Sequence, residues 1–416
     1  MAAMKQRGYS VIDLFSGCGG FSLGVQSAGL NLVAAVDSSP HAVQTYGENL
    51  PSNPHVLKKN LWGFKPEDLE KHIRKNKVDI IIGGPPCQGF SLARQVDGAN
   101  SGDRLVGDER RQLFKQYFKY VEHFQPKMFV MENVRGIKSA EDGKIFKAIL
   151  KKADQLGYTV DEGLLSAWKF GVPQKRIRQI FFGTRNDLPA FSMEQWLMPT
   201  HASIDEPGHG KLKDIVTLWE AIGDLPRLRA NESTNQYDIA RRKNHRNHYG
   251  RRYLDEVLQV AEARELTGHV ARRHSTRDLR DFNRLNEGET SAQAIERGVK
   301  MDFPYNRGVF KDRYTRQHRN RLCSTIVAHL SKDGLMFIHP TQQRSLTPRE
   351  AARIQSFPDW FVFPVARTHQ YRLIGDSVPP LLAQAIGRGV KNYLDWCKKK
   401  NPASHRAPLL HAVGEV

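Results

Sequence analysis

The chain has 416 residues, and its 63 Lys and Arg residues outnumber its 44 Asp and Glu residues, which gives a formal net charge of +19 at pH 7. Hydrophobic residues make up 39% of the chain and charged residues 26%, which is typical of a globular protein and excludes a disordered or collagen-like one. No run approaches the roughly 18 apolar residues that a membrane span requires, so we expect neither membrane insertion nor secretion. The excess of positive charge makes nucleic acid the first partner to consider.

From Tyr9 to Phe182, short apolar segments alternate with helix-prone polar segments, which predicts an α/β fold with a doubly wound, mostly parallel, Rossmann-like sheet. We predict strands at residues 11–15, 32–36, 78–82, 127–131 and 180–182. We predict helices between them at residues 42–50, 110–124 and 144–156.

After residue 186 the chain becomes polar and arginine-rich, and the regular alternation ends. We therefore predict a catalytic and cofactor-binding domain over residues 1–186, a second, smaller and irregular domain over 187–342, and a C-terminal segment over 343–416 that completes the first domain. Within that last segment, apolar residues at helical spacing predict a helix over 381–396 that packs on the first domain.

The four cysteines are far apart in the sequence: Cys18, Cys87, Cys323 and Cys397. They form neither the CxxC pair of a zinc ribbon or redox couple nor the dense pattern of a disulfide framework, which fits a cytoplasmic protein. We expect no metal site, because His245 and His248 have no cysteine or carboxylate at ligand spacing.

A glycine-rich turn, Phe-Ser-Gly-Cys-Gly-Gly-Phe at residues 15–21, follows the first predicted strand. Such a turn lets a ligand approach the backbone at the carboxyl edge of a parallel sheet. Asp37 ends the second predicted strand about 20 residues after Gly17, where a carboxylate can accept hydrogen bonds from ribose hydroxyls. These residues predict a nucleotide-like cofactor and leave NAD and S-adenosylmethionine both open. Ser22 stands where a third glycine would complete the dinucleotide fingerprint, which weakens the case for NAD.

Three later segments carry reactive side chains at predicted strand ends. Cys87 follows Gly83-Gly84-Pro85-Pro86, where the prolines fix the backbone and glycines leave the thiol room to meet a substrate. Glu132 ends the next predicted strand. Arg176 and Arg178 share one face of an extended segment, and their guanidinium groups suit a phosphate or a carbonyl acceptor.

In this order the motifs resemble the C5-cytosine-specific DNA methyltransferase family, of the bacterial restriction-modification or antiphage-defence type. The resemblance rests on residues 15–20, 85–87, 132–134, 174–178, 346–353 and 375–380. It covers the first domain and the C-terminal segment, and it leaves only the polar middle outside.

The resemblance implies that Cys87 adds to carbon 6 of a flipped-out cytosine while Glu132 donates a proton or hydrogen bond to ring nitrogen 3. Carbon 5 then takes the methyl group of S-adenosylmethionine, and S-adenosylhomocysteine is the product. It implies that Arg178 holds the cytosine carbonyl oxygen and that Arg176 positions the catalytic loop or a phosphate. It also implies that Asn133 orients the turn and that Pro86 contacts the base through its backbone.

For the cofactor, the resemblance implies contacts from the glycine-rich turn, the ribose-binding acid, two residues at the adenine and two at the methionine end. These residues are Phe15, Gly17, Cys18, Gly19 and Phe21 in the turn, Asp37 at the ribose, Asn60 and Leu113 at the adenine, and Ser377 and Val378 at the methionine end. Asp37 and Asn60 depart from the commoner pattern, in which a glutamate and an acid stand at these positions.

The partner that the resemblance implies is double-stranded DNA, with residues 187–342 as the target-recognition domain. Arginines of that domain, together with Arg176, are expected to contact phosphates or guanine edges. We single out Arg241, Arg242, Arg272 and Arg273. We expect a monomer that works beside other proteins of a defence system.

Three alternatives remain open. An RNA cytosine methyltransferase would share the catalytic residues, but the long middle domain and the lack of a Cys-Phe-Thr element stand against it. A catalytically inert DNA-binding relative is disfavoured because every catalytic position is filled. A nicotinamide-dependent enzyme would leave residues 85–87 unexplained.

Overall fold

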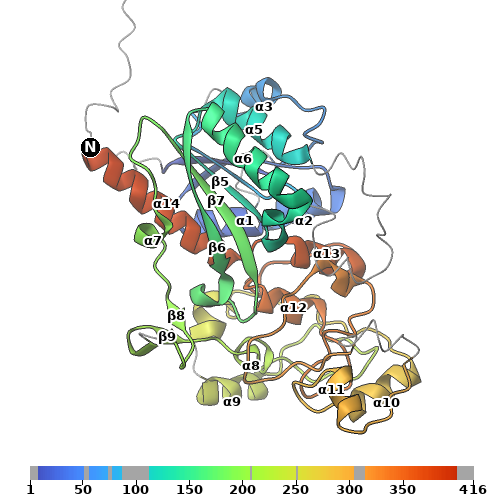
Figure 1. Ribbon diagram of the computed structural model, residues 1–416. Helices are drawn as coiled ribbons and strands as arrows, with labels where there is room; N and C mark the ends of the chain where they lie inside the picture. The colour runs from blue at the N-terminus through green and yellow to red at the C-terminus, as the bar shows by residue number, and fades with distance from the viewer. Residues whose placement is uncertain are drawn as a thin grey trace, which may run out of the picture.

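A seven-stranded sheet with the strand order β3-β2-β1-β4-β5-β7-β6 forms the centre of the computed structural model (Figure 1), which describes residues 8–50, 56–73, 77–86, 112–206, 209–249, 252–303 and 314–400. The strands are β1 Ser10–Leu14, β2 Asn31–Asp37, β3 Val56–Lys58, β4 Ile80–Gly83, β5 Met128–Val134, β6 Tyr158–Ser166 and β7 Ile177–Arg185. Strands β1 to β5 pair in parallel, whereas β7 lies between β5 and β6 and is antiparallel to both. The predicted α/β fold class is confirmed.

Each of the five predicted strands corresponds to an observed strand, but β3 and β6 were missed. β3 has only three residues and is partly exposed. β6 lies at the edge of the sheet, where its side chains are mostly half-buried, and Asp161, Glu162 and Gly163 interrupt its apolar pattern. An edge strand needs no continuous apolar run, so its sequence gives a weaker signal.

Helices cover both faces of the sheet (Figure 1). On one face, α3 Pro66–His72, α5 Leu113–Phe124 and α6 Lys144–Gln155 share a core with the strands. On the other, α1 Gly20–Ser27 packs against α14 Pro380–Lys400, and Phe21 and Leu382 belong to the same core. The C-terminal helix thus packs against α1, and the assignment of the C-terminal segment to the first domain remains a prediction. Of the helices in the described ranges, none has the length and apolar composition needed to cross a membrane.

The remaining elements are short and lie mostly below the sheet in Figure 1. They are α2 Pro40–Asn49, α7 Met193–Trp196, β8 His201–Ala202, β9 Lys213–Asp214, α8 Leu218–Ile222, α9 Ile239–Tyr249, α10 Thr276–Arg284, α11 Ser291–Glu296, α12 Pro348–Ile354 and α13 Arg367–Asp376. Leu218 and Leu254 share a core with Cys18 and Phe357, whereas the part around Phe282 has a core of its own. The limits of the second domain remain a prediction.

A buried ion pair connects the middle region to the segment that begins at residue 343, and further buried pairs lie within that segment. Arg353 is fully buried and pairs with Asp224 and Asp359, each at 2.5 Å. Arg344 pairs with Glu350 at 2.7 Å, and both side chains are also buried. Burial alone would raise the pKa of Glu350, but the Arg344 guanidinium lowers that pKa well below its ordinary value. The 346–353 motif therefore stabilises the packing of the two regions. Removing one partner of its ion pairs would leave a buried charge uncompensated.

His274 gives the middle region a specific pH dependence. Its Nε2 accepts the backbone N–H of Ser345 at 3.2 Å, and burial lowers its pKa to about 4. Because an unfolded histidine has a pKa of about 6.5, stability should be lost as the pH falls from about 6.5 toward 4, by at most about 1.4 kcal/mol per pH unit for one group. We expect His274→Gln, whose amide oxygen can accept the same N–H, to show a smaller loss of unfolding free energy between pH 7 and pH 5 in urea titrations. Equal losses in the two proteins would contradict this assignment.

Candidate active site

Glu132 and Arg178 form an ion pair at the carboxyl edge of the sheet. Val134 of β5 lies opposite Arg178 of β7 in the antiparallel register, so Glu132 and Arg178 are on the same face. Arg178 Nε lies 2.9 Å from Glu132 Oε1, and both side chains are only 12% exposed. Burial lowers the pKa of Arg178, and the charge of Glu132 offsets part of this effect. The site thus holds a carboxyl group and a guanidinium group side by side with little water around them.

The chain that leads to Cys87 begins beside this pair. Asn133 donates from Nδ2 to the Pro85 carbonyl at 3.1 Å and accepts the N–H of Val134 at 2.8 Å. A Cβ at Gly84 would lie 3.0 Å from Glu132 Oε2, so the absence of a side chain there leaves room for the carboxylate. Pro85 is buried and Pro86 is exposed, whereas Cys87 lies outside the described residues. Asn133 therefore fixes the backbone two residues before the predicted nucleophile.

Arg176 is buried and bonded to protein carbonyls. Its guanidinium donates to the carbonyls of Ile326 at 2.9 Å, Gly375 at 3.2 Å and Ser377 at 2.8 Å. Burial and the nearby charge of Arg178 lower its pKa well below the ordinary value. Of the two roles expected for Arg176, this geometry favours positioning of the backbone over a phosphate contact.

The glycine-rich turn is fixed by Asp37, at the end of β2. Asp37 accepts the N–H of Gly17 at 2.9 Å through Oδ2 and the N–H of Ser39 at 2.8 Å through Oδ1. Burial raises the pKa of Asp37, while these backbone N–H groups oppose the shift. Gly19 has a φ of 96°, in the region that favours glycine, and Phe15 also has a positive φ, of 60°. The turn thus has an unusual backbone conformation at Phe15 and is held next to a carboxylate.

Residues from the two ends of the chain meet at this turn. Cys18 Sγ lies 3.1 Å from Ser377 Oγ, which in turn donates to the Leu373 carbonyl at 2.6 Å. Val378 and Phe21 are buried in one core. Burial raises the pKa of the Cys18 thiol to about 12, so this cysteine is not a nucleophile at neutral pH.

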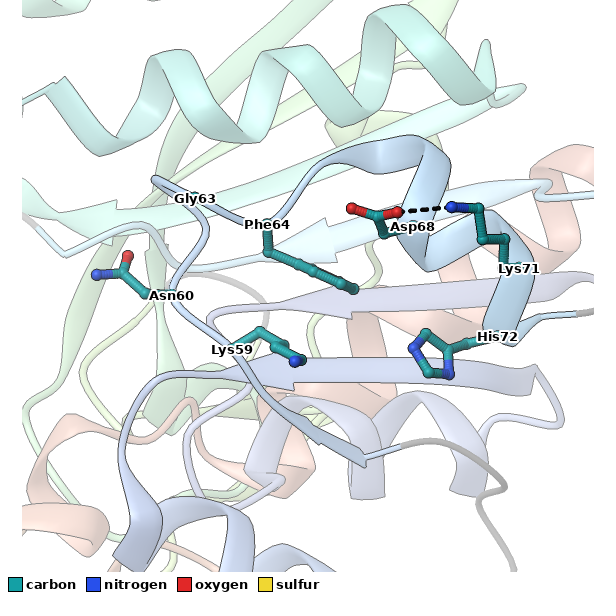
Figure 2. A pocket seen from close by; sticks show the side chains of 7 residues that line it. All are labelled: Lys59, Asn60, Gly63, Phe64, Asp68, Lys71 and His72. Atoms are coloured by element: carbon teal, nitrogen blue, oxygen red, sulfur yellow. Dashed lines mark hydrogen bonds and ion pairs between the residues drawn. The ribbon is translucent and has the colours of Figure 1, made fainter.

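The two residues expected at the adenine lie further along the same edge. Asn60 follows β3, is exposed, and accepts the N–H of Trp62 at 3.1 Å; Leu113 is buried at the start of α5. Asn60 also borders a surface hollow of about 550 Å³. In Figure 2 its amide points away from the Phe64 and His72 side chains that line this hollow. Asn60 is the one residue common to the hollow and the predicted cofactor residues, so the hollow does not coincide with the predicted cofactor site.

The model of the family described as "C-5 cytosine-specific DNA methylase" matches residues 9–392. The chain belongs to this family. It is 35% identical over 403 residues to the type II methyltransferase M.DdeI of Desulfomicrobium norvegicum, covering 93% of this chain and 89% of the relative. It is 34% identical over 382 residues to M1.HphI of Haemophilus parahaemolyticus, covering 91% and 86%.

Among solved structures, a prophage-encoded E. coli protein described as a DNA modification methyltransferase aligns with a TM-score of 0.70 and 29% identity, covering 93% of this chain and all of that one. The S. pombe Dnmt2 methyltransferase, at 17% identity and a TM-score of 0.51, shares the fold. The predicted activity is confirmed: the protein is a DNA (cytosine-5-)-methyltransferase.

In this methyltransferase, the arginines expected to contact DNA differ in how the protein uses them. Arg242 pairs with Asp224 at 3.2 Å and stacks on Tyr237, with its guanidinium carbon 3.9 Å from the ring centre. Arg272 donates to the carbonyls of Leu330, Ser331 and Lys332. Arg241 is half-buried beside Trp219, and Arg273 is exposed. Of the four, Arg273 is thus the one most open to a DNA phosphate.

A buried hydrogen-bond chain that the sequence motifs did not predict lies under the glycine-rich turn. Tyr46 donates to Ser22 Oγ at 2.9 Å, and Ser22 donates to Asp13 at 2.6 Å. Burial raises the pKa of Asp13 to about 7. The signal was present in the sequence: Asp13 interrupts an apolar strand, and Ser22 replaces the third glycine of the dinucleotide fingerprint.

Proposed function

We propose that this methyltransferase transfers the methyl group of S-adenosylmethionine to carbon 5 of a flipped-out cytosine in a specific duplex DNA site, through an adduct between Cys87 and carbon 6. The observation that carries the proposal is the buried Glu132–Arg178 pair beside the Pro85 carbonyl that Asn133 holds. This places an acid and a hydrogen-bond donor next to the segment that leads to the thiol.

In the proposed reaction, the Cys87 thiolate attacks carbon 6 while Glu132 donates a proton or hydrogen bond to ring nitrogen 3, which makes carbon 5 nucleophilic. Arg178 uses Nε for Glu132 and Nη1 for the Ile177 carbonyl, so Nη2 is the atom we assign to the cytosine carbonyl oxygen. Loss of the carbon 5 proton after methylation restores the ring double bond and expels Cys87. Flipping the base costs a few kcal/mol, which contacts with DNA must offset.

The residues at the other end of the site fit S-adenosylmethionine, which supplies an electrophilic methyl group when bound. Asp37 uses one acceptor position on each oxygen for the backbone, and the others suit ribose hydroxyls. Ser377 and Val378 adjoin the turn at Cys18, as expected for the methionine end. We assign Phe15, Gly17 and Gly19 to the cofactor turn and Asn60 and Leu113 to the adenine, as the family resemblance implies.

The relatives are named type II methyltransferases. We therefore propose that the protein is the modification enzyme of a bacterial restriction-modification or antiphage system, acting as a cytoplasmic monomer. The DNA sequence that it recognises can be identified by expressing the protein in a host without cytosine methylation and sequencing the methylated cytosines.

The test of the proposed substrate is a comparison of labelled S-adenosylmethionine with duplex DNA and with tRNA. We expect label in DNA, at carbon 5 of cytosine, and none in tRNA. Label in tRNA alone would contradict the proposal and favour the RNA-modifying alternative.

A pair of arginine variants separates DNA contacts from internal ones. Because Arg273 is exposed, Arg273→Ala should weaken DNA binding and flatten the slope of log K against log salt by roughly 0.9 for each phosphate that is no longer neutralised. Arg242→Ala removes one of the two arginine partners of buried Asp224, so it should lower the unfolding temperature and leave the slope unchanged. Fluorescence anisotropy at several salt concentrations, with thermal unfolding, measures both. If the salt slope changed in Arg242→Ala and stayed the same in Arg273→Ala, Arg242 rather than Arg273 would be the DNA contact.

A further inference from the structure

Two buried glutamines join the middle region to the turn at Ser377. Gln355, just after α12, donates from Nε2 to the carbonyls of Ile374 and Ser377, both at 2.8 Å. Its Oε1 accepts a hydrogen bond from Gln174 Nε2. Gln174 Oε1 accepts the N–H of Ile326 at 3.0 Å. A relay of side-chain amides thus runs from Ile326 to Ser377.

Arg176 connects the same two points directly. It donates to the Ile326 carbonyl at 2.9 Å and to the Ser377 carbonyl at 2.8 Å. The Ser377 carbonyl therefore accepts from both Arg176 and Gln355, and Ile326 is held through both its N–H and its carbonyl. All three side chains are at most 1% exposed, so water could not replace a missing hydrogen bond without opening the core.

The segment around Ile326 is also attached to the chain just before Arg178. Cys323 donates its N–H to the Pro173 carbonyl at 3.0 Å, and its own carbonyl accepts the N–H of Lys175 at 2.9 Å. A displacement of residues 323–326 therefore acts on the Arg178 side of the active site and, through the relay, on Ser377.

We propose that Gln355 and Gln174 are positioning residues that fix the Ser377 turn against residues 323–326 and thereby couple DNA binding to cofactor affinity. The inference rests on the proposed function, because it takes Ser377 as part of the cofactor site. Neither glutamine touches a reacting atom. DNA that binds to the middle region strengthens cofactor binding through this relay, and the cofactor strengthens DNA binding by the same factor.

The test measures the affinity of S-adenosylhomocysteine by calorimetry with and without duplex DNA. Gln355→Met keeps the length of the side chain and removes the three relay bonds that Gln355 makes. We expect the free protein to bind S-adenosylhomocysteine about tenfold more weakly, as expected when one or two hydrogen bonds that hold its site are removed. The factor by which DNA raises the affinity for S-adenosylhomocysteine should fall toward one.

Gln342→Met is the matched control. Gln342 is also buried, and it bonds to His339, Arg344 and the N–H of Leu228 rather than to the Ser377 turn. This variant should lower the unfolding temperature with unchanged affinity and coupling. A role in stability alone would make the two variants behave alike.

Gln174→Met interrupts the relay and leaves both bonds from Gln355 to the turn. It should weaken the coupling, because the direct Arg176 link between Ile326 and Ser377 remains, while its affinity without DNA stays near that of the wild type. If Gln355→Met does not fold, this variant decides: wild-type coupling overturns the inference, and weakened coupling supports it. Wild-type protein that methylates DNA but shows no coupling also overturns it, whereas wild-type protein that neither binds S-adenosylhomocysteine nor methylates DNA contradicts the proposed function instead.

Discussion

Cys87→Ala should abolish methyl transfer to duplex DNA while cofactor and DNA binding remain measurable. Without the thiol no bond forms at carbon 6, and carbon 5 of cytosine does not become nucleophilic enough to accept the methyl group. The measurement is incorporation of label from S-adenosylmethionine, with binding followed by calorimetry and fluorescence anisotropy. Turnover near that of the wild type would contradict the mechanism.

Cys397→Ala is the control for this variant. Cys397 is buried in α14, packs in the core that α14 shares with α1, and is not among the predicted catalytic or cofactor-binding residues. Burial raises the pKa of its thiol, as expected for a structural cysteine. It should keep its methyl-transfer rate, and any loss should be confined to stability.

Glu132→Gln should slow methyl transfer by about 10²–10⁴, the range typical of general acid catalysis. The amide keeps the shape of the side chain but supplies no acidic proton, and it replaces the charge that Arg178 Nε now faces at 2.9 Å. Cofactor affinity should change little, because Asp37 and Ser377 lie elsewhere at the edge of the sheet. The single-turnover rate with saturating DNA measures the effect directly.

Glu162→Gln provides the comparison. Glu162 lies on β6 and bonds to Gln179 and Lys138, so it is a carboxylate of the same sheet without contact to Arg178. We expect a rate within about twofold of the wild type, since surface pairs contribute little. An unchanged rate in Glu132→Gln would remove Glu132 from the mechanism.

The sequence predicted the parts of the fold that depend on continuous apolar segments. β1, β2, β4 and β5 lie in the sheet interior and are buried, so most of their residues are apolar. The antiparallel insertion of β7 could not be predicted, because pairing direction depends on where the intervening chain crosses the sheet and not on the strand's own residues.

For the site, the sequence indicated Glu132 and Arg178 because both follow from motif order, and the structure places them in contact. It could not show which arginines face DNA, because the partner that occupies an arginine can be distant in the chain, as Asp224 is from Arg353. Gln355 was missed for the same reason: its partners are the carbonyls of Ile374 and Ser377 and the amide of Gln174.

Covalent trapping on a modified substrate shows directly whether Cys87 forms a bond to carbon 6 of cytosine. The wild-type protein is incubated with S-adenosylmethionine and duplex DNA whose cytosines are replaced by 5-fluorocytosine, where fluorine at carbon 5 prevents the proton loss that expels the thiol. We predict a stable protein–DNA complex that survives denaturation, carries a methyl group, maps to Cys87 and is absent with Cys87→Ala. If no such complex forms under conditions in which ordinary cytosine is methylated, the account of covalent catalysis by Cys87 is contradicted.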